Sequence, residues 1–169
     1  TINGDGRVDP SRGGLTAPGP RGENRAGVAA VIYGWPGLRG ASIDLAPEPV
    51  IRRPPGLRTS FLFGSNPGDI LADTLSAVDL DQEGLEDLWI GRPGFDAGRG
   101  LGTRSDVGAA LVVYGDSQGL PETWEPRRGE LPCNLRIKAV VGSEPEDLLA
   151  YSLVTGDADG DGHPDLFVN

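Results

Sequence analysis

The chain has 169 residues, which is long enough for one ordinary domain with a hydrophobic core. Its formal net charge of −10 argues against nucleic-acid binding, because contacts to phosphates need a basic face. A single cysteine, Cys133, rules out an intrachain disulfide, and no apolar stretch is long enough to span a membrane.

The distribution of glycine and proline indicates the fold class. The chain contains 27 Gly and 15 Pro, and these residues fall between short apolar runs. Short apolar runs separated by turn-forming residues are typical of many short strands joined by tight turns. Long stretches with apolar residues at helical spacing are absent from the sequence. We therefore expect an all-β fold.

The best-defined strands follow one another in the central part of the chain. Apolar runs predict a first strand over about 57–63, a second over 71–78, a third over 88–90 and a fourth over about 108–114. An acidic loop joins the second strand to the third. Four short strands followed by a turn are the pattern of one β-propeller blade.

This pattern repeats along the chain. The acidic segment that begins at Asp79 returns at Asp157, 78 residues later (157 − 79), and a related segment opens the chain at Thr1. Upstream, Leu57–Arg58 matches Leu135–Arg136. A β-sandwich also contains regular short strands, but it does not repeat one acidic loop at a fixed period. We expect a partial β-propeller of about two four-stranded antiparallel blades, with repeat units at about 1–56, 57–134 and 135–169.

The repeated acidic loop has the pattern D-x-[DN]-x-[DE]-G-x-x-D, which predicts a Ca²⁺ site. Ca²⁺ takes six to eight oxygen ligands, and carboxylates at positions one, three, five and nine can converge on one ion around a tight turn. Glycine at position six permits the turn, and the main-chain carbonyl of position seven can add a ligand. The predicted ligand residues are Asp157, Asp159, Asp161, His163 and Asp165 in the third copy, Asp79, Asp81, Glu83, Leu85 and Asp87 in the second, and Asn3, Asp5, Arg7 and Asp9 in the first.

Two other interpretations of the loop are weaker. An EF-hand needs a bidentate Glu at position twelve and a following helix, whereas Arg12, Ile90 and Val168 stand there and β-prone residues follow. Asp-Gly-rich segments can also be plain hydrophilic turns, but three copies in one register disfavour this. In the first copy Thr1 and Asn3 leave only two carboxylates, so we expect weak or no binding there.

The unit resembles the FG-GAP repeat of integrin α-subunit propellers and of many bacterial secreted proteins. Phe63–Gly64 and, more loosely, Gly91–Pro93 correspond to the family's name motifs, with the acidic loop between them. The chain departs from the family pattern at Thr1 and Glu83, where Asp is expected, and after Asp9, where no Asp-Leu-x-Val-Gly strand follows. The resemblance implies a propeller, bound Ca²⁺, an extracellular or cell-surface location, and a role in adhesion or ligand recognition.

The sequence shows no candidate set of catalytic residues. His163 is the only histidine and lies inside an acidic loop, so no histidine-based triad can be assembled. We expect a non-catalytic recognition or scaffold module that binds a protein or glycan ligand at a propeller face. Two alternatives stay open: part of a propeller enzyme, a lyase or hydrolase whose active site lies in other blades, and a building block that assembles with further copies of itself.

The sequence contains no methionine. We therefore expect the chain to be a piece of a longer propeller rather than a closed, stable monomer, since a closed propeller needs four to eight blades.

Overall fold

The computed structural model describes residues 11–14, 17–19, 21–45, 53–98, 103–125 and 135–169, and in this part of the chain every regular element is a strand. The described residues contain no helix that is long and apolar enough to cross a membrane. The strands are β1 (Ser11–Gly14), β2 (Val28–Ile32), β3 (Thr59–Phe63), β4 (Leu75–Val78), β5 (Asp87–Arg92), β6 (Ala109–Val113), β7 (Thr123–Trp124), β8 (Ile137–Val141), β9 (Leu153–Gly156) and β10 (Asp165–Val168).

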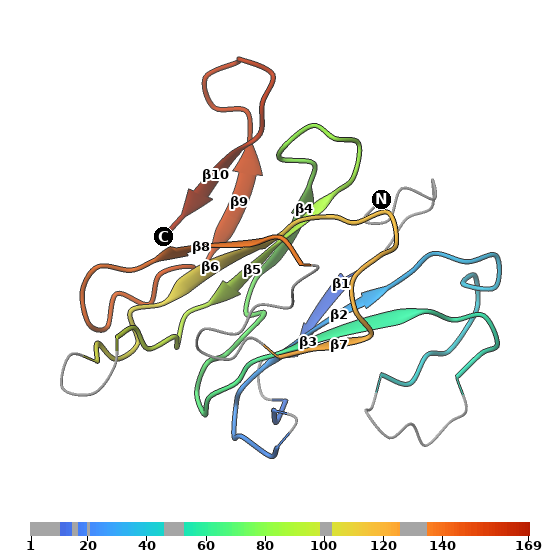
Figure 1. The fold of residues 1–169 in the computed structure, drawn as a ribbon, viewed down its shortest axis with the longest axis horizontal. Helices are drawn as coiled ribbons and strands as arrows, with labels where there is room; N and C mark the ends of the chain where they lie inside the picture. The colour runs from blue at the N-terminus through green and yellow to red at the C-terminus, as the bar shows by residue number, and fades with distance from the viewer. Residues whose placement is uncertain (1–10, 15–16, 20, 46–52, 99–102, 126–134) are drawn as a thin grey trace.

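The strands form three sheets (Figure 1), which follow one another in chain order except that β7 joins the first sheet after β4, β5 and β6 have passed through the second. The first sheet has the order β1-β2-β3-β7, the second β4-β5-β6-β8, and the third contains β9 and β10. All pairings are antiparallel except that of β7 with β3, which is parallel. The predicted all-β fold is confirmed, and the arrangement is that of a partial β-propeller of a few blades.

The sheets and the sequence repeat are offset by one strand. The strand predicted near 57–63 exists as β3, but it pairs with β2 and completes the first sheet instead of opening the second. Its counterpart β8 pairs with β6 and completes the second sheet in the same way. The grouping of four consecutive predicted strands into one blade was therefore wrong by one strand. Local apolar runs reveal where strands lie, whereas the sheet that a strand joins depends on pairing with distant segments.

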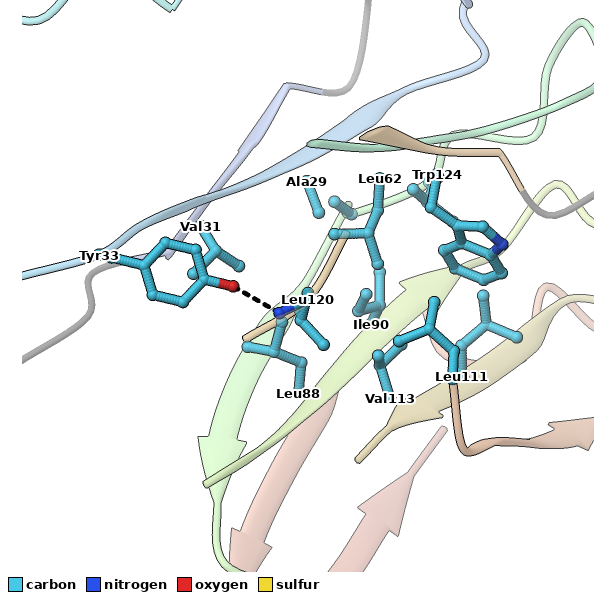
Figure 2. Packing of buried hydrophobic residues seen from close by; sticks show 13 residues of the cluster. Ala29, Val31, Tyr33, Leu62, Leu88, Ile90, Leu111, Val113, Leu120 and Trp124 are labelled. Carbon is cyan, nitrogen blue, oxygen red and sulfur yellow. Dashed lines mark hydrogen bonds between the residues drawn. The ribbon is translucent and has the colours of Figure 1, made fainter. Parts of the chain in front are cut away.

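A continuous core lies between the first and second sheets. Period-two alternation directs one face of each strand to it: Ala29 and Val31 come from β2, and Leu88 and Ile90 come from β5 (Figure 2). The Tyr33 hydroxyl accepts a hydrogen bond from the Leu120 amide at 2.8 Å, so this buried ring keeps a partner for its polar atom. Burying each large aliphatic side chain stabilises the fold by about 1.5–3 kcal/mol.

The opposite face of the second sheet packs on the third. Trp89 and Val112 point away from the first core and contact Leu153, Leu166 and Val168 of the third sheet. The second sheet therefore uses one set of alternate residues toward the first sheet and the other set toward the third, as stacked propeller blades require.

Main-chain contacts that recur with the repeat join neighbouring sheets. The Leu71 amide donates to the Ala26 carbonyl at 2.9 Å, and the Leu149 amide donates to the Val107 carbonyl at 3.1 Å. Beside these bonds Gly108 has φ +75°, and a Cβ there would lie 2.2 Å from the Leu149 nitrogen. The sheets approach so closely at this point that only glycine fits.

Candidate metal centre

Two acidic loops lie at the same end of the second and third sheets (Figure 1). One connects β4 to β5 and covers residues 79–86, and the other connects β9 to β10 and covers residues 157–164. The Gln82 side-chain amide donates to the Gly162 carbonyl at 2.9 Å, so the two loops are in direct contact. We call them the second loop and the third loop, after the repeat copies to which they belong.

The third loop is folded around its own aspartates. Asp157 accepts hydrogen bonds from the amides of Gly160 at 2.7 Å and Gly162 at 2.9 Å. Asp165, which begins β10, accepts one from the Ala158 amide at 2.8 Å. These bonds bend the chain so that the first and last carboxylates of the loop approach each other. Gly162 has φ +86°, which favours glycine at position six of the pattern.

The second loop repeats this framework. Asp79 accepts from the amides of Glu83 at 3.1 Å and Gly84 at 2.8 Å, and Gly84 has φ +90°. Asp87 accepts from the Leu80 amide at 3.0 Å, as Asp165 does from Ala158. In both loops position one accepts from position six and position nine accepts from position two, so these bonds belong to the repeat. The other bond to position one comes from position five in the second loop and from position four in the third.

Each loop brings three carboxylates together. One oxygen from each of Asp79, Asp81 and Asp87 lies within 4.8 Å of the others, and the same holds for Asp157, Asp159 and Asp165. Two oxygens on opposite sides of a Ca²⁺ ion, each about 2.4 Å from it, are about 4.8 Å apart. These clusters can hold a metal ion, and their all-oxygen donors suit a hard cation such as Ca²⁺.

The buried position of Asp87 strengthens this reading. Asp87 is completely buried, and burial raises the pKa of its carboxyl above the usual range, while the Gly115 and Leu80 amides lower it and the charges of Asp81 and Asp79 raise it further. A buried carboxylate beside two other carboxylates is costly unless a cation or several donors compensate its charge. The Leu80 and Gly115 amides supply part of this compensation, and a bound cation would supply more.

The other predicted ligands lie outside these two groups of three. The Glu83 carboxylate contacts the Arg136 guanidinium, and Asp161 accepts a hydrogen bond from the His163 amide at 2.7 Å. Leu85 and His163 are in their loops as the pattern requires, and their predicted carbonyl ligation stays a prediction. The first-loop residues Asn3, Asp5, Arg7 and Asp9 lie outside the described residues, as does Cys133.

Arg136 is a site residue that sequence reasoning did not single out. It directly precedes β8, and its guanidinium reaches Asp81 at 3.2 Å and Glu83 at 2.5 Å. The sequence marked Arg136 only as part of the repeated Leu-Arg dipeptide. Its partners Asp81 and Glu83 lie more than fifty residues earlier in the chain, so no local pattern connects them.

Comparison with known proteins gives two related matches. The chain is 32% identical over 171 aligned residues to a phosphatidylinositol-glycan-specific phospholipase D of Mus musculus and 30% identical to that of Rattus norvegicus. Each alignment covers 99% of this chain and 17% of the relative, so the chain spans about a sixth of these enzymes. No family model matches the chain.

Proposed function

We propose that the chain is a calcium-binding β-propeller module of the FG-GAP type that serves extracellular recognition, adhesion or scaffolding and has no catalysis of its own. The observation that carries the proposal is the pair of adjacent loops with one hydrogen-bonding framework and three converging carboxylates each. Asp79, Asp81 and Asp87 would hold one ion and Asp157, Asp159 and Asp165 the other. Main-chain carbonyls and water would complete the coordination.

The glycines of the name motif support membership of the FG-GAP group. A Cβ at Gly64 would lie 2.0 Å from the Ala26 carbonyl oxygen, and one at Gly142 would lie 2.0 Å from that of Val107. Glycine at this repeated position lets neighbouring sheets touch through their backbones. The motif therefore has a structural reason within this chain, independent of any ligand.

Ca²⁺ would stiffen the loop end of the sheets, where a protein or glycan ligand would contact side chains from several blades. Two ions would also offset four of the ten net negative charges. Extracellular calcium modules bind with dissociation constants of roughly 10⁻⁴–10⁻³ M, which suits millimolar calcium outside cells.

Calorimetric titration with Ca²⁺ tests the proposal. The wild-type chain should bind at both described loops, while Asp159→Asn and Asp81→Asn should each remove one site and the double variant both. Asp116→Asn is the matched control, because the half-buried Asp116 carboxylate accepts from the Gln118 amide and lies outside the two clusters. Absence of heat at millimolar Ca²⁺ in the wild-type chain would refute the proposal.

A second candidate function comes from the named relatives. Their similarity covers nearly the whole chain, so the module would be the non-catalytic part of an enzyme that acts on phosphatidylinositol glycans. Vesicles that carry phosphatidylinositol glycan distinguish the candidates. Calcium-dependent binding to these vesicles and not to glycan-free ones favours the enzyme module, whereas binding to an unrelated glycan on an array favours a separate recognition role. Hydrolysis by this chain alone would contradict both.

A further inference from the structure

The second loop differs from the third by a cation of the protein itself. Arg136 donates to Asp81 at 3.2 Å and to Glu83 at 2.5 Å, and its guanidinium carbon lies 4.8 Å from the centre of the Tyr114 ring. Within the described part of the chain, no ion pair involves Asp157, Asp159, Asp161 or Asp165. The two loops therefore share a framework but not an electrostatic environment.

The position of Arg136 is part of the scaffold. Its carbonyl accepts a hydrogen bond from the Tyr114 amide at 3.0 Å, where β6 ends and β8 is about to begin. In the preceding repeat Arg58 lies over the Tyr33 ring at 4.5 Å, and its carbonyl accepts from the Tyr33 amide in the same way. The arginine and tyrosine thus recur as a pair. What is specific to Arg136 is its pair of carboxylate partners.

Glu83 explains how the carboxylates are reached. The third loop has Asp161 at this position, whose shorter side chain accepts a hydrogen bond inside its own loop from His163. Glu83 is longer by one methylene group and lies outside the group of three converging carboxylates, with its oxygen on the guanidinium. The replacement of Asp by Glu in the second loop therefore gives Arg136 a partner beside the metal cluster.

Asp81 is the point of competition. One of its oxygens belongs to the converging group, while its Oδ2 atom accepts from Arg136. A divalent ion bound to Asp81 would be repelled by the positive guanidinium of Arg136. Arg136 is covalently part of the chain and stays near Asp81, whereas the ion must bind from solution. Arg136 is 54% exposed and borders an open groove of about 500 Å³ beside Tyr114 and Lys138, so its side chain has room to move away.

We propose that Arg136 is an internal competitor of the cation at the second loop and makes it the weaker of the two sites. The inference rests on the proposed calcium function and adds a regulation to it: the third loop fills first, and the second fills when Ca²⁺ is high enough to displace Arg136 from Asp81 and Glu83. The loops are in contact through Gln82 and Gly162, so the end of the propeller would respond to calcium in two steps.

Calorimetry on variants that retain a single site tests this inference. In an Asp159→Asn background only the second loop should bind Ca²⁺. Adding Arg136→Gln should strengthen the Ca²⁺ affinity of that loop roughly fivefold, because it removes the two solvent-exposed ion pairs with which Ca²⁺ competes. In an Asp81→Asn background the third loop should be unaffected by Arg136→Gln. Arg136→Lys keeps the charge without the two-pronged contact and should give an intermediate affinity.

Arg58→Gln is the matched control, because Arg58 occupies the same repeat position. The substitution removes the same charge and the same kind of contact with a tyrosine ring, but the Arg58 side chain reaches the Gln118 carbonyl instead of the second loop. It should leave both affinities unchanged. An unchanged or weaker second-loop affinity in Arg136→Gln would overturn the inference while leaving calcium binding intact. Absence of Ca²⁺ binding at both loops in the unsubstituted chain would instead overturn the proposed function.

Discussion

At the residue scale, Asp69 and Arg92 form a buried ion pair on which the stability of the fold should depend. Both side chains are almost fully buried, and Asp69 also accepts from the amides of Ser65 at 2.8 Å and Asn66 at 2.7 Å. Arg92 lies over the Phe95 ring at 4.5 Å. Removing one partner leaves the other charge buried and uncompensated, which costs more than the pair contributes.

We therefore predict that Asp69→Asn lowers the free energy of unfolding by about 3–5 kcal/mol, measured by urea denaturation. Asp147→Asn is the control, because Asp147 occupies the same repeat position and accepts from the amides of Ser143 and Glu144, but is exposed. Its effect should stay below about 1 kcal/mol. Equal losses for both variants would show that the turn, and not the ion pair, supplies the stability.

At the element scale, the sheets depend on the repeated backbone contacts between them. Gly108 has a left-handed backbone conformation and forms a β-bridge with Leu149, so that an added Cβ would lie 2.2 Å from the Leu149 nitrogen. The residues that follow Leu71 and Leu149 also share a left-handed backbone conformation: Ala72 has φ +68° and Ala150 has φ +70°. The sheet-to-sheet spacing is therefore set by the main chain as well as by the core.

Gly108→Ala should destabilise the chain by more than about 2 kcal/mol, because the left-handed conformation costs about 1–2 kcal/mol for alanine and the Cβ also meets the backbone of Leu149. Gly68→Ala is the matched control. Gly68 has φ +81° with nothing within 4 Å of an added Cβ, and its repeat counterpart is Glu146. Thermal melts of both variants check this, and an equal effect would show that close packing at Gly108 contributes nothing.

The acidic loops should couple metal binding to the stability of their hairpins. A ligand that binds only the folded state at ten times its dissociation constant adds about 1.4 kcal/mol. For a chain of this size, chelating Ca²⁺ should then lower the melting temperature by about 3–6 °C. Asp159→Asn should reproduce part of this drop and show a smaller response to chelation. A melting temperature that is unaffected by chelation would contradict a structural role for the ion.

At the scale of the whole molecule, both outer sides of the stack of sheets carry apolar residues, which are buried on the first sheet and exposed on the third. On the outer side of the first sheet, Phe61 and Phe63 pack with Ala30 along a groove of about 490 Å³. On the outer side of the third sheet, Val154 is 61% and Phe167 is 50% exposed. Phe167 holds the repeat position of Trp89, which the third sheet covers. The third sheet therefore exposes apolar residues at positions that are covered in the second sheet.

We predict that the isolated chain self-associates through the exposed face of the third sheet, because exposed apolar sheet faces and unpaired edges favour further pairing. Sedimentation analysis should show larger species as concentration rises, and Val154→Ser combined with Phe167→Ser should reduce them. Tyr151→Ser is the control, since Tyr151 is 61% exposed but lies in the turn before β9. A monodisperse, folded monomer of the wild-type chain at all concentrations would refute this prediction.

Much of the local structure could be read from the sequence. The predicted strands near 57–63, 71–78, 88–90 and 108–114 correspond to β3, β4, β5 and β6, because short apolar runs and turn residues act within a few positions of the chain. The acidic loops were also evident, since the hydrogen bonds that fold them join residues at most seven positions apart. At this range, residue type and spacing determine the geometry.

Only the tertiary structure decided which distant segments meet. β7 pairs in parallel with β3, sixty-two residues earlier (123 − 61), and β8 completes the second sheet instead of beginning the third. The contact of Arg136 with Asp81 and Glu83, and the absence of Glu83 and Asp161 from the converging carboxylates, are decided in the same way. Such contacts depend on how whole sheets stack, and stacking depends on burying side chains from many strands at once, which leaves no local pattern at the residues concerned.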